Sequence, residues 1–368
     1  MARSPSRFVV VGAGGIGGSV GAHFARAGHD VLFVDSLLPH VEAIARDGLS
    51  VEGQSTFRVR VPAVTPAGLA GALDGRPLET VLLAVKAHHT AAALEAVAPL
   101  LDARGVIVSL QNGLNERQIA QRVGAERTMG AFVNFGADYL GPGRIKLSSR
   151  AELYLGELDG RMTDRLERLG AIFREAFLEH TQLTDNIWGH LWGKLGYVSM
   201  LFATATIDDS MGDAFADPRS RSLLANLAGE IVRVADAEGV RSVGFSGYDA
   251  DAMRFTTPRD WAAIHRCLDQ RVIVNRQSLN THNGLWRDMV IKHRPTEIDA
   301  QLGVVVDVAR AHGLATPLNE RVIDLIHDLE AGRRGRGPAN IEELRALNEA
   351  VYPHEGHDAS QRARSASS

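Results

Sequence analysis

The stretch FVVVGAGGIGGSVGAHFARAGHDVLFVD spans residues 8–35 of a 368-residue chain, and the rest of the first half follows from it. Its first four residues are a short Val-rich run, the composition of a buried parallel strand. Gly-x-Gly-x-x-Gly follows at once over residues 12–17, and a helix is predicted from about Gly18 to Ala27. A second strand over residues 31–34 ends in Asp35. Strand, glycine turn, helix and strand in this order predict a dinucleotide-binding β-α-β unit.

Each glycine of the turn has a physical role. Gly12 permits the tight turn, Gly14 lets the backbone approach a pyrophosphate, and Gly17 lets the helix pack close to the strand. The free N–H groups at the start of the helix favour an anion. The cofactor-binding residues predicted in the turn are Gly12, Gly14, Gly15, Ile16 and Gly17. A purely structural glycine turn is the alternative interpretation.

Asp35 and Ser36 indicate which dinucleotide the turn would hold. Asp35 lies about 20 residues beyond the turn, where a carboxylate accepts hydrogen bonds from the adenosine ribose hydroxyls. The same carboxylate would repel a 2′-phosphate, and Ser36 brings no positive charge to attract one. We therefore predict that both residues contact the cofactor, and that the cofactor is NAD rather than NADP.

The composition excludes several classes of protein. Hydrophobic residues make up 45% of the chain and charged residues 23%, as in ordinary soluble globular proteins. A net charge of −4 gives no overall attraction to nucleic acid or to an anionic membrane. The single cysteine, Cys267, rules out an intrachain disulfide framework. We expect a cytoplasmic protein with a small-molecule substrate and no nucleic-acid or membrane partner.

The secondary-structure pattern changes midway along the chain. Strands and helices alternate through the first half, which predicts an α/β Rossmann-like, doubly wound domain, with antiparallel strands over residues 136–158 at the far edge of its sheet. Helical periodicity then dominates, which predicts an all-α domain. The expected boundaries are 1–183 for the dinucleotide-binding domain, 184–332 for a helical substrate and dimerisation domain, and 333–368 for a largely disordered tail with a short helix over 341–351.

Lys86 and Asn112 each follow a predicted buried strand. Ligands of open parallel sheets bind outside the carboxyl ends of the strands, so both residues are expected to face the cofactor. A solvated surface lysine and a turn-forming asparagine before Gly113 are the alternatives.

Lys194 lies in the unusual helical stretch Trp188-Gly-His190-Leu-Trp192-Gly-Lys194. A lysine on a mostly apolar helix loses hydration, which lowers its pKa and suits it to donating a proton. A lysine whose ammonium extends into water is the alternative. His190, one turn earlier, is more simply a packed histidine than a proton relay.

The block Arg294-Pro-Thr-Glu297-Ile-Asp299 offers a carboxylate that could tune Lys194 or bind substrate, and the pattern alone leaves Glu297 and Asp299 both open. The same block also fits a simple helix start. We expect no metal site, because His88 and His89 are adjacent and no second ligand cluster has suitable spacing.

These stretches together resemble the ketopantoate reductase family over roughly residues 7–330. The matching pieces, in order, are the glycine motif, Val-Lys86-Ala, Gln-Asn112-Gly, Leu-Trp-x-Lys194, Arg-Pro-Thr-Glu297-Ile-Asp and Ala311-His-Gly-Leu-Ala-Thr-Pro317. The resemblance implies a Rossmann domain joined to a helical domain, with substrate in the cleft between them, and often a homodimer. It implies that Lys194 is the general acid, that Glu297 positions the lysine or a substrate hydroxyl, and that Lys86 and Asn112 hold the nicotinamide end of the cofactor near the substrate.

The chain departs from the family pattern where the substrate would bind. Two asparagines that follow the lysine in members reducing ketopantoate are replaced by Val198 and Phe202, and a carboxylate-binding serine corresponds to about Gly284. The basic residue that usually binds the 2′-phosphate is replaced by Ser36. A pocket built from Val198 and Phe202 would hydrogen-bond a small polar acid poorly.

The leading functional prediction is an NAD-dependent oxidoreductase that acts on a 2-oxo/2-hydroxy acid, or a related ketone or alcohol, bulkier than ketopantoate. Asn112, Val198, Phe202 and Gly284 are its expected substrate-side residues. One alternative is an NADPH-dependent 2-dehydropantoate 2-reductase of pantothenate biosynthesis. An alternative of another class is a non-catalytic dinucleotide-binding sensor, against which the retained Lys194 and Glu297 argue.

Overall fold

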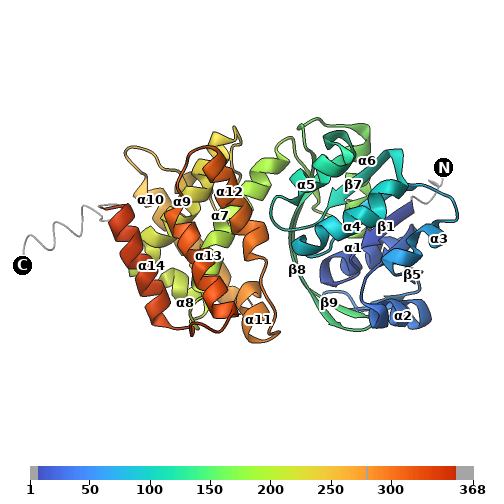
Figure 1. The fold of residues 1–368 in the computed structure, drawn as a ribbon, viewed down its shortest axis with the longest axis horizontal. Coiled ribbons are helices and arrows are strands. Elements are labelled where there is room, and N and C mark those ends of the chain that lie inside the picture. The colour runs from blue at the N-terminus through green and yellow to red at the C-terminus, as the bar shows by residue number, and fades with distance from the viewer. Residues whose placement is uncertain (1–6, 279–280, 354–368) are drawn as a thin grey trace, which may run out of the picture. The chain divides into compact units, whose positions relative to one another are not determined.

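A computed structural model describes residues 7–278 and 281–353, and the chain forms two compact units that divide between Trp188 and Gly189 (Figure 1). The boundary expected after residue 183 therefore falls slightly early. It precedes α7 (Ile187–Thr204), whose first two residues belong to the first unit. Each unit has its own elements and core, and we describe each by itself.

The first unit is built on a ten-stranded mixed sheet. Its strands are β1 (Arg7–Val11), β2 (Asp30–Val34), β3 (Leu49–Gly53), β4 (Phe57–Val59), β5 (Ala63–Val64), β6 (Leu78–Leu83), β7 (Leu101–Ser109), β8 (Thr128–Gly141), β9 (Arg144–Glu157) and β10 (Gln182–Leu183). The order is β4-β3-β9-β8-β7-β6-β1-β2-β5, with β10 also paired to β9. The run from β8 to β5 is parallel throughout, which confirms the predicted Rossmann-like domain.

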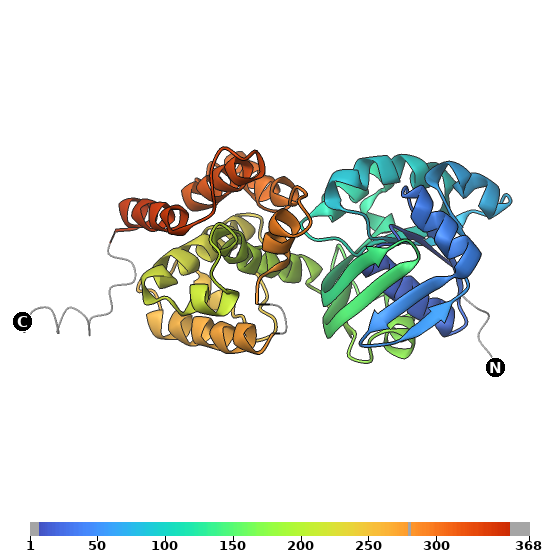
Figure 2. The same cartoon turned by 90° about the horizontal axis from the view of Figure 1, so that it is seen from below.

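The antiparallel strands expected over residues 136–158 are the second half of β8 and the whole of β9, which form one long antiparallel pair. They do not form the edge of the sheet, because β3 pairs with β9 in parallel and β4 pairs with β3. Figure 2 shows these blue strands beside the green β8–β9 pair. The prediction of an edge position was wrong because the pairing joins strands almost a hundred residues apart, which local pattern does not reveal.

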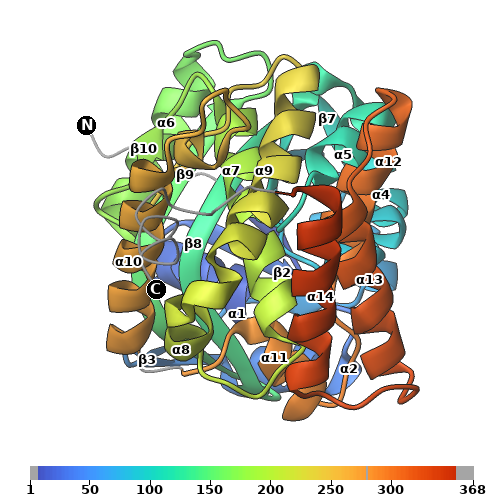
Figure 3. The same ribbon diagram turned by 90° about the vertical axis from the view of Figure 1, so that its left-hand side faces the viewer.

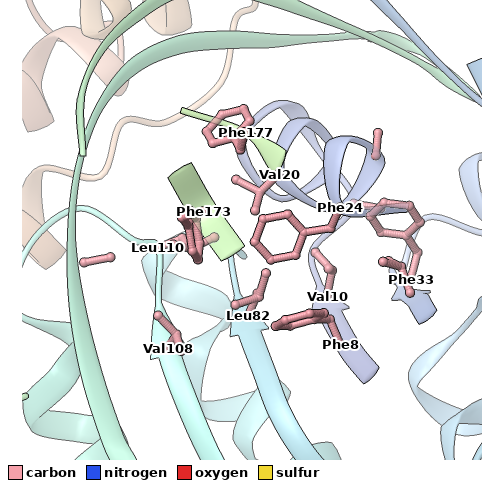
Figure 4. Close-up of a cluster of buried hydrophobic side chains, with 14 of the residues drawn as sticks. Phe8, Val10, Val20, Phe24, Phe33, Leu82, Val108, Leu110, Phe173 and Phe177 are labelled. Carbon is pink, nitrogen blue, oxygen red and sulfur yellow. The ribbon is translucent and has the colours of Figure 1, made fainter. Parts of the chain in front are cut away.

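Helices cover both faces of this sheet. One face carries α1 (Gly15–Arg26), α2 (Leu38–Asp47) and α6 (Asp164–Ala176), and the other carries α3 (Leu69–Leu73), α4 (Thr90–Val97) and α5 (Asn115–Val123). Alternate residues of β1 therefore enter different cores, with Val10 on the α1 side and Val9 on the α4 side. Figure 4 shows Phe24 of α1 packed between Phe8 and Phe173 of α6, with ring centroids 4.8 Å and 4.9 Å away.

The second unit is helical, as the pattern predicts. After α7 come α8 (Met211–Ala216), α9 (Arg221–Ala237), α10 (Trp261–Gln277), α11 (Gly284–Val290), a π-helical turn (Asp299–Gly303), α12 (Val304–Ala311), α13 (Pro317–Glu330) and α14 (Pro338–Val351). The buried Glu230 of α9 accepts hydrogen bonds from the backbone N–H groups of Leu318 and Asn319, which fixes the start of α13 against α9.

The last helix is longer than the sequence pattern indicates. The short helix expected over 341–351 begins at Pro338 and packs along α13 and α9 (Figure 3). Asn348 bonds to Asn226 of α9, and the hydroxyl of Tyr352 donates to Glu230. These tertiary contacts explain why residues 338–352 join the helical unit. The remainder of the expected tail, residues 354–368, lies outside the described residues. No helix in the described part of the chain is long and apolar enough to cross a membrane.

Candidate active site

The glycine turn is as tight as its sequence predicts. Gly12 has φ of +94°, and a Cβ there would lie 2.8 Å from the backbone of Ala84 and Val85. A Cβ at Gly17 would lie 2.1 Å from the carbonyl oxygen of Gly12, so α1 starts in direct contact with the turn. A Cβ at Gly14, by contrast, would meet no atom within 4 Å. The turn therefore leaves open space at the N-terminus of α1, where unpaired N–H groups attract an anion.

Asp35 ties the end of β2 to the glycine turn. One carboxylate oxygen accepts the Ala13 N–H at 2.8 Å and the other accepts the Leu37 N–H at 2.9 Å. Each oxygen keeps a second lone pair, so the carboxylate can still accept from ribose hydroxyls. Ser36 beside it is exposed.

Two residues at this end of the site were not predicted from the sequence. His40 is buried; its Nε2 donates to the Ala13 carbonyl and its Nδ1 accepts the Gly143 N–H, each at 2.9 Å. Tyr139 of β8 packs edge-on against His40. Burial together with the negative charge of Asp35 raises the pKa of Tyr139. Both join elements far apart in the chain, and no local motif marks them.

Lys86 and Asn112 lie where the sequence predicts, just past β6 and β7. The order β7-β6-β1-β2 places these two strand ends beside those that carry the glycine turn and Asp35. All the predicted cofactor-binding residues therefore lie at the carboxyl edge of four neighbouring strands, which is where doubly wound sheets bind ligands. An open anion-binding turn, a carboxylate for the ribose and polar strand ends together fit a dinucleotide such as NAD.

In the second unit, Lys194 is half-buried on α7. Burial of the ammonium lowers the pKa of Lys194 to about 8, and the charge of Glu297 opposes that shift. The preceding residue, Gly193, lets the backbone at Val243 pack directly on the helix, because a Cβ at Gly193 would lie 1.9 Å from the Val243 carbonyl oxygen. A lysine with this pKa can donate and accept a proton near neutral pH.

The structure separates Glu297 from Asp299, which the sequence left as alternatives. Glu297 is partly buried and acts electrostatically on Lys194. Asp299 is exposed and forms an ion pair with His327 at 3.0 Å. The segment is not a capping box, because the Thr296 hydroxyl accepts the Ile298 N–H and the Thr296 N–H donates to Glu330. Of the two acids, Glu297 is therefore the one whose charge acts on Lys194.

The three departures from the family pattern on the expected substrate side differ in their surroundings. Phe202 is fully buried in the helical core and Val198 is nearly so. Gly284 begins α11 and a Cβ there would meet only the far end of Arg287, at 3.9 Å. The preceding Asn283 caps α11 and donates to the Leu201 carbonyl of α7 at 2.9 Å. Gly284 thus leaves open space next to a residue anchored to the lysine helix.

Burial lowers the pKa of His190 to about 4, so its imidazole is neutral at neutral pH. A neutral buried ring agrees with the packed histidine expected there. Among the described residues, no group of three or more His, Cys, Asp or Glu side chains is arranged to hold a metal ion.

Comparison with known proteins gives consistent matches in both units. The family description "Ketopantoate reductase PanE/ApbA" matches residues 8–160, and its C-terminal counterpart matches residues 186–330. The 2-dehydropantoate 2-reductase of Pyrococcus abyssi is 28% identical over 327 residues, which cover 88% of this chain and 98% of that protein.

Solved structures give the same result. The 2-dehydropantoate 2-reductase of Geobacter metallireducens is 26% identical with a TM-score of 0.73, covering 88% of this chain and 99% of that one. A D-mandelate dehydrogenase, solved with NADH and also with NADH and anilino(oxo)acetate, shares the fold at 21% identity and a TM-score of 0.73, covering 89% of this chain and 99% of that one. The named relatives are oxidoreductases, and the chain belongs to the ketopantoate reductase family.

Proposed function

We propose that this chain is an NAD-dependent oxidoreductase that acts on a 2-oxo/2-hydroxy acid, or a related ketone or alcohol, bulkier than ketopantoate. The observation that carries the proposal is a half-buried Lys194 whose pKa is lowered to about 8 by burial, against the opposing charge of Glu297, in a chain with an intact dinucleotide edge. Nicotinamide, when bound, supplies or accepts the hydride.

The role of each residue follows from its chemistry. Lys194 protonates the oxygen of the substrate carbonyl during reduction, and takes the proton from the hydroxyl in the reverse direction. Its positive charge also stabilises the oxyanion as it develops. Glu297 keeps the ammonium charged and oriented. Asn112 and Lys86 contact the nicotinamide end of the cofactor, and Asp35 binds the adenosine ribose.

Three observations support a substrate bulkier than ketopantoate. Val198 has no hydrogen-bonding side chain, the apolar Phe202 is withdrawn into the helical core, and Gly284 leaves open space. A site without those polar groups has little means to select a small polar acid. The D-mandelate dehydrogenase shows that this fold can hold NADH with an oxoacetate that carries an anilino group.

The cofactor preference rests on Asp35, whose two oxygens accept the backbone N–H groups of Ala13 and Leu37, and on the uncharged Ser36 that follows it. NADPH-dependent reduction of 2-dehydropantoate is the second candidate. It is favoured by the names of the curated relatives that match most of the chain.

Titration of the purified protein with NADH and NADPH, followed by a turnover screen of 2-oxo acids, tests the proposal. We expect tighter binding of NADH and turnover of 2-oxo acids with aryl or branched side chains. Lys194→Met should reduce kcat by about 100-fold or more while leaving the NADH affinity unchanged. Lys146→Met, at an exposed lysine of β9, is the control and should retain full activity.

Two results would contradict this proposal. Tighter binding of NADPH with efficient 2-dehydropantoate reduction would establish the second candidate instead. Near wild-type turnover by Lys194→Met would remove the lysine from the reaction.

A further inference from the structure

A chain of hydrogen bonds, buried at its centre and partly buried at its two ends, joins the two strand ends that carry Lys86 and Asn112. The Gln111 amide donates from Nε2 to the Val85 carbonyl at 2.9 Å and to the Thr90 hydroxyl at 2.7 Å. The Thr90 hydroxyl donates to Asn115 Oδ1 at 3.4 Å, and Asn115 Nδ2 donates to the Asn112 carbonyl at 2.6 Å. The chain thus runs from the residue before Lys86 to Asn112 itself.

The two ends of this chain fix the direction of every bond in it. Both terminal groups are backbone carbonyls, which only accept. The Gln111 and Asn115 side chains must therefore turn their NH₂ groups toward Val85 and Asn112. Asn115 then presents its oxygen to Thr90, so the threonine hydroxyl donates there and accepts from Gln111. No alternative arrangement of the amides or the hydroxyl satisfies the same contacts.

The three connecting side chains are buried, with exposed fractions of 5% for Gln111, 0% for Thr90 and 9% for Asn115. Water has little access to compete for these bonds, so breaking one leaves a buried polar atom without its partner. The Val85 segment is also held from its other side, because Gly12 approaches the Ala84–Val85 backbone too closely to admit a Cβ. The glycine turn is therefore held against the end of β6 by close backbone packing, and the end of β6 is held to the end of β7 by the hydrogen-bond chain.

We propose that Gln111, Thr90 and Asn115 are positioning residues that fix the Val85 and Asn112 backbone, and so hold Lys86 and Asn112 in place for the nicotinamide end of the dinucleotide. The proposal rests on the cofactor role assigned to Lys86 and Asn112 above. It adds three residues that need not touch the cofactor themselves. Their effect is confined to one end of the ligand, which distinguishes positioning from general support of the fold.

Binding measurements on Thr90 variants test this role without any substrate. Thr90→Val keeps the shape of the side chain and removes the hydroxyl that links Gln111 to Asn115, whereas Thr90→Ser keeps that hydroxyl. Val97→Ala, at the far end of the same helix, is the control for lost stability, because Val97 is fully buried and outside the hydrogen-bond chain. Affinities are measured by calorimetry for NADH and for ADP-ribose, which lacks the nicotinamide.

We expect Thr90→Val to weaken NADH by about tenfold and ADP-ribose by less than about twofold, since a small misplacement of contact groups acts only where they contact the ligand. Thr90→Ser should restore the NADH affinity, and Val97→Ala should leave it unchanged. Equal weakening of both ligands, or NADH affinity in Thr90→Val equal to that of Val97→Ala, would overturn the positioning role alone. A wild-type protein that binds neither NADH nor NADPH would overturn the proposed function and this inference with it.

Discussion

The two units place their functional groups by different physical means. In the first unit the ligand edge is made mainly of backbone, and Gly12 and Gly17 are fixed because a Cβ has no room there. In the second unit the proposed reactive group is a side chain, Lys194, whose proton affinity depends on burial and on Glu297. A site made by close backbone packing requires glycine at fixed positions. The residues around a reactive side chain, by contrast, can be substituted one at a time. A chain can thus keep a cofactor site while its substrate site changes, which is what we propose for Val198 and Gly284.

The largest effect is expected where the backbone site has no tolerance. Gly17→Ala would place a Cβ 2.1 Å from the Gly12 oxygen and 2.8 Å from the Ala84 Cβ, so α1 must move away from the turn. A displacement of roughly an ångström should weaken NADH by about 100-fold and lower the thermal stability. Calorimetric titration and thermal unfolding measure the two effects.

Gly14→Ala is the matched control, because its Cβ meets no protein atom and the residue already has a φ of −66°. Gly14→Ala controls for the loss of stability: its thermal stability should stay at the wild-type level. Its NADH affinity should still fall, because the added methyl group occupies the open space where the ligand would bind. If Gly17→Ala bound NADH as tightly as the wild type, the close approach of helix and turn would not govern cofactor binding.

The next effect compares a buried glutamate in each unit. Glu116, at the start of α5, is fully buried, and neither carboxylate oxygen has a hydrogen-bond partner among the described residues, although Ser109 lies near enough to act on it. Burial raises the pKa of Glu116 to about 7. Glu230 is equally buried but accepts hydrogen bonds from Leu318, Asn319 and Tyr352.

The sign of the pH effect at Glu116 follows from its raised pKa. Between its ordinary pKa and about 7, the folded chain holds a proton that the unfolded chain has lost, so this group makes stability fall as pH rises. Glu116→Gln removes the ionisation, and it should be more stable than wild type by about 3 kcal/mol at pH 8 and about equal to it at pH 4. Denaturant unfolding at the two pH values measures the difference.

Glu230→Gln should change stability in the opposite direction, although burial raises the pKa of Glu230 as well, because hydrogen bonds to the Glu230 carboxylate counteract that shift. Its amide would turn an NH₂ group toward donors that now bond to a carboxylate, which should cost about 1–3 kcal/mol of stability at pH 8. Two results would contradict this comparison: a gain of stability in Glu230→Gln, or a Glu116→Gln variant whose stability depends on pH as the wild type's does. Either would show that hydrogen bonding is not what makes the two buried glutamates differ in their effect on stability.

The sequence allowed prediction of the features that depend on local chemistry. The glycine turn, the strand ends at Lys86 and Asn112, and the apolar helix of Lys194 all carry their signal within a few residues. The pairing of β3 with β9 could not be predicted, because it depends on partners distant in the chain. The same holds for the start of α14 and for the bonds of His40, which are decided by tertiary contacts.

The choice between Glu297 and Asp299 shows where pattern reasoning ends within a single site. The two acids are two residues apart, and their directions depend on how the chain enters the π-helical turn at Asp299–Gly303. A Thr-x-x-Asp spacing is typical of a regular helix start, yet the Thr296 hydroxyl bonds to Ile298 and Asp299 pairs with His327. Only the folded arrangement assigns each carboxylate its partner.

The smallest effect comes from titrating the side-chain site itself. Because the pKa of Lys194 is lowered to about 8, its protonated fraction falls about tenfold between pH 7 and pH 9. Reduction requires the ammonium, so kcat for reduction should fall about tenfold over this range, and oxidation, which requires the neutral amine, should rise by the same factor. Lys194→Arg stays charged throughout and should lose both trends along with most of its activity.

Opposite slopes for the two directions, measured with the same substrate pair, would separate a titrating catalytic lysine from a general loss of folding, which would slow both. Parallel or flat profiles would show that the proton in the reaction comes from another group.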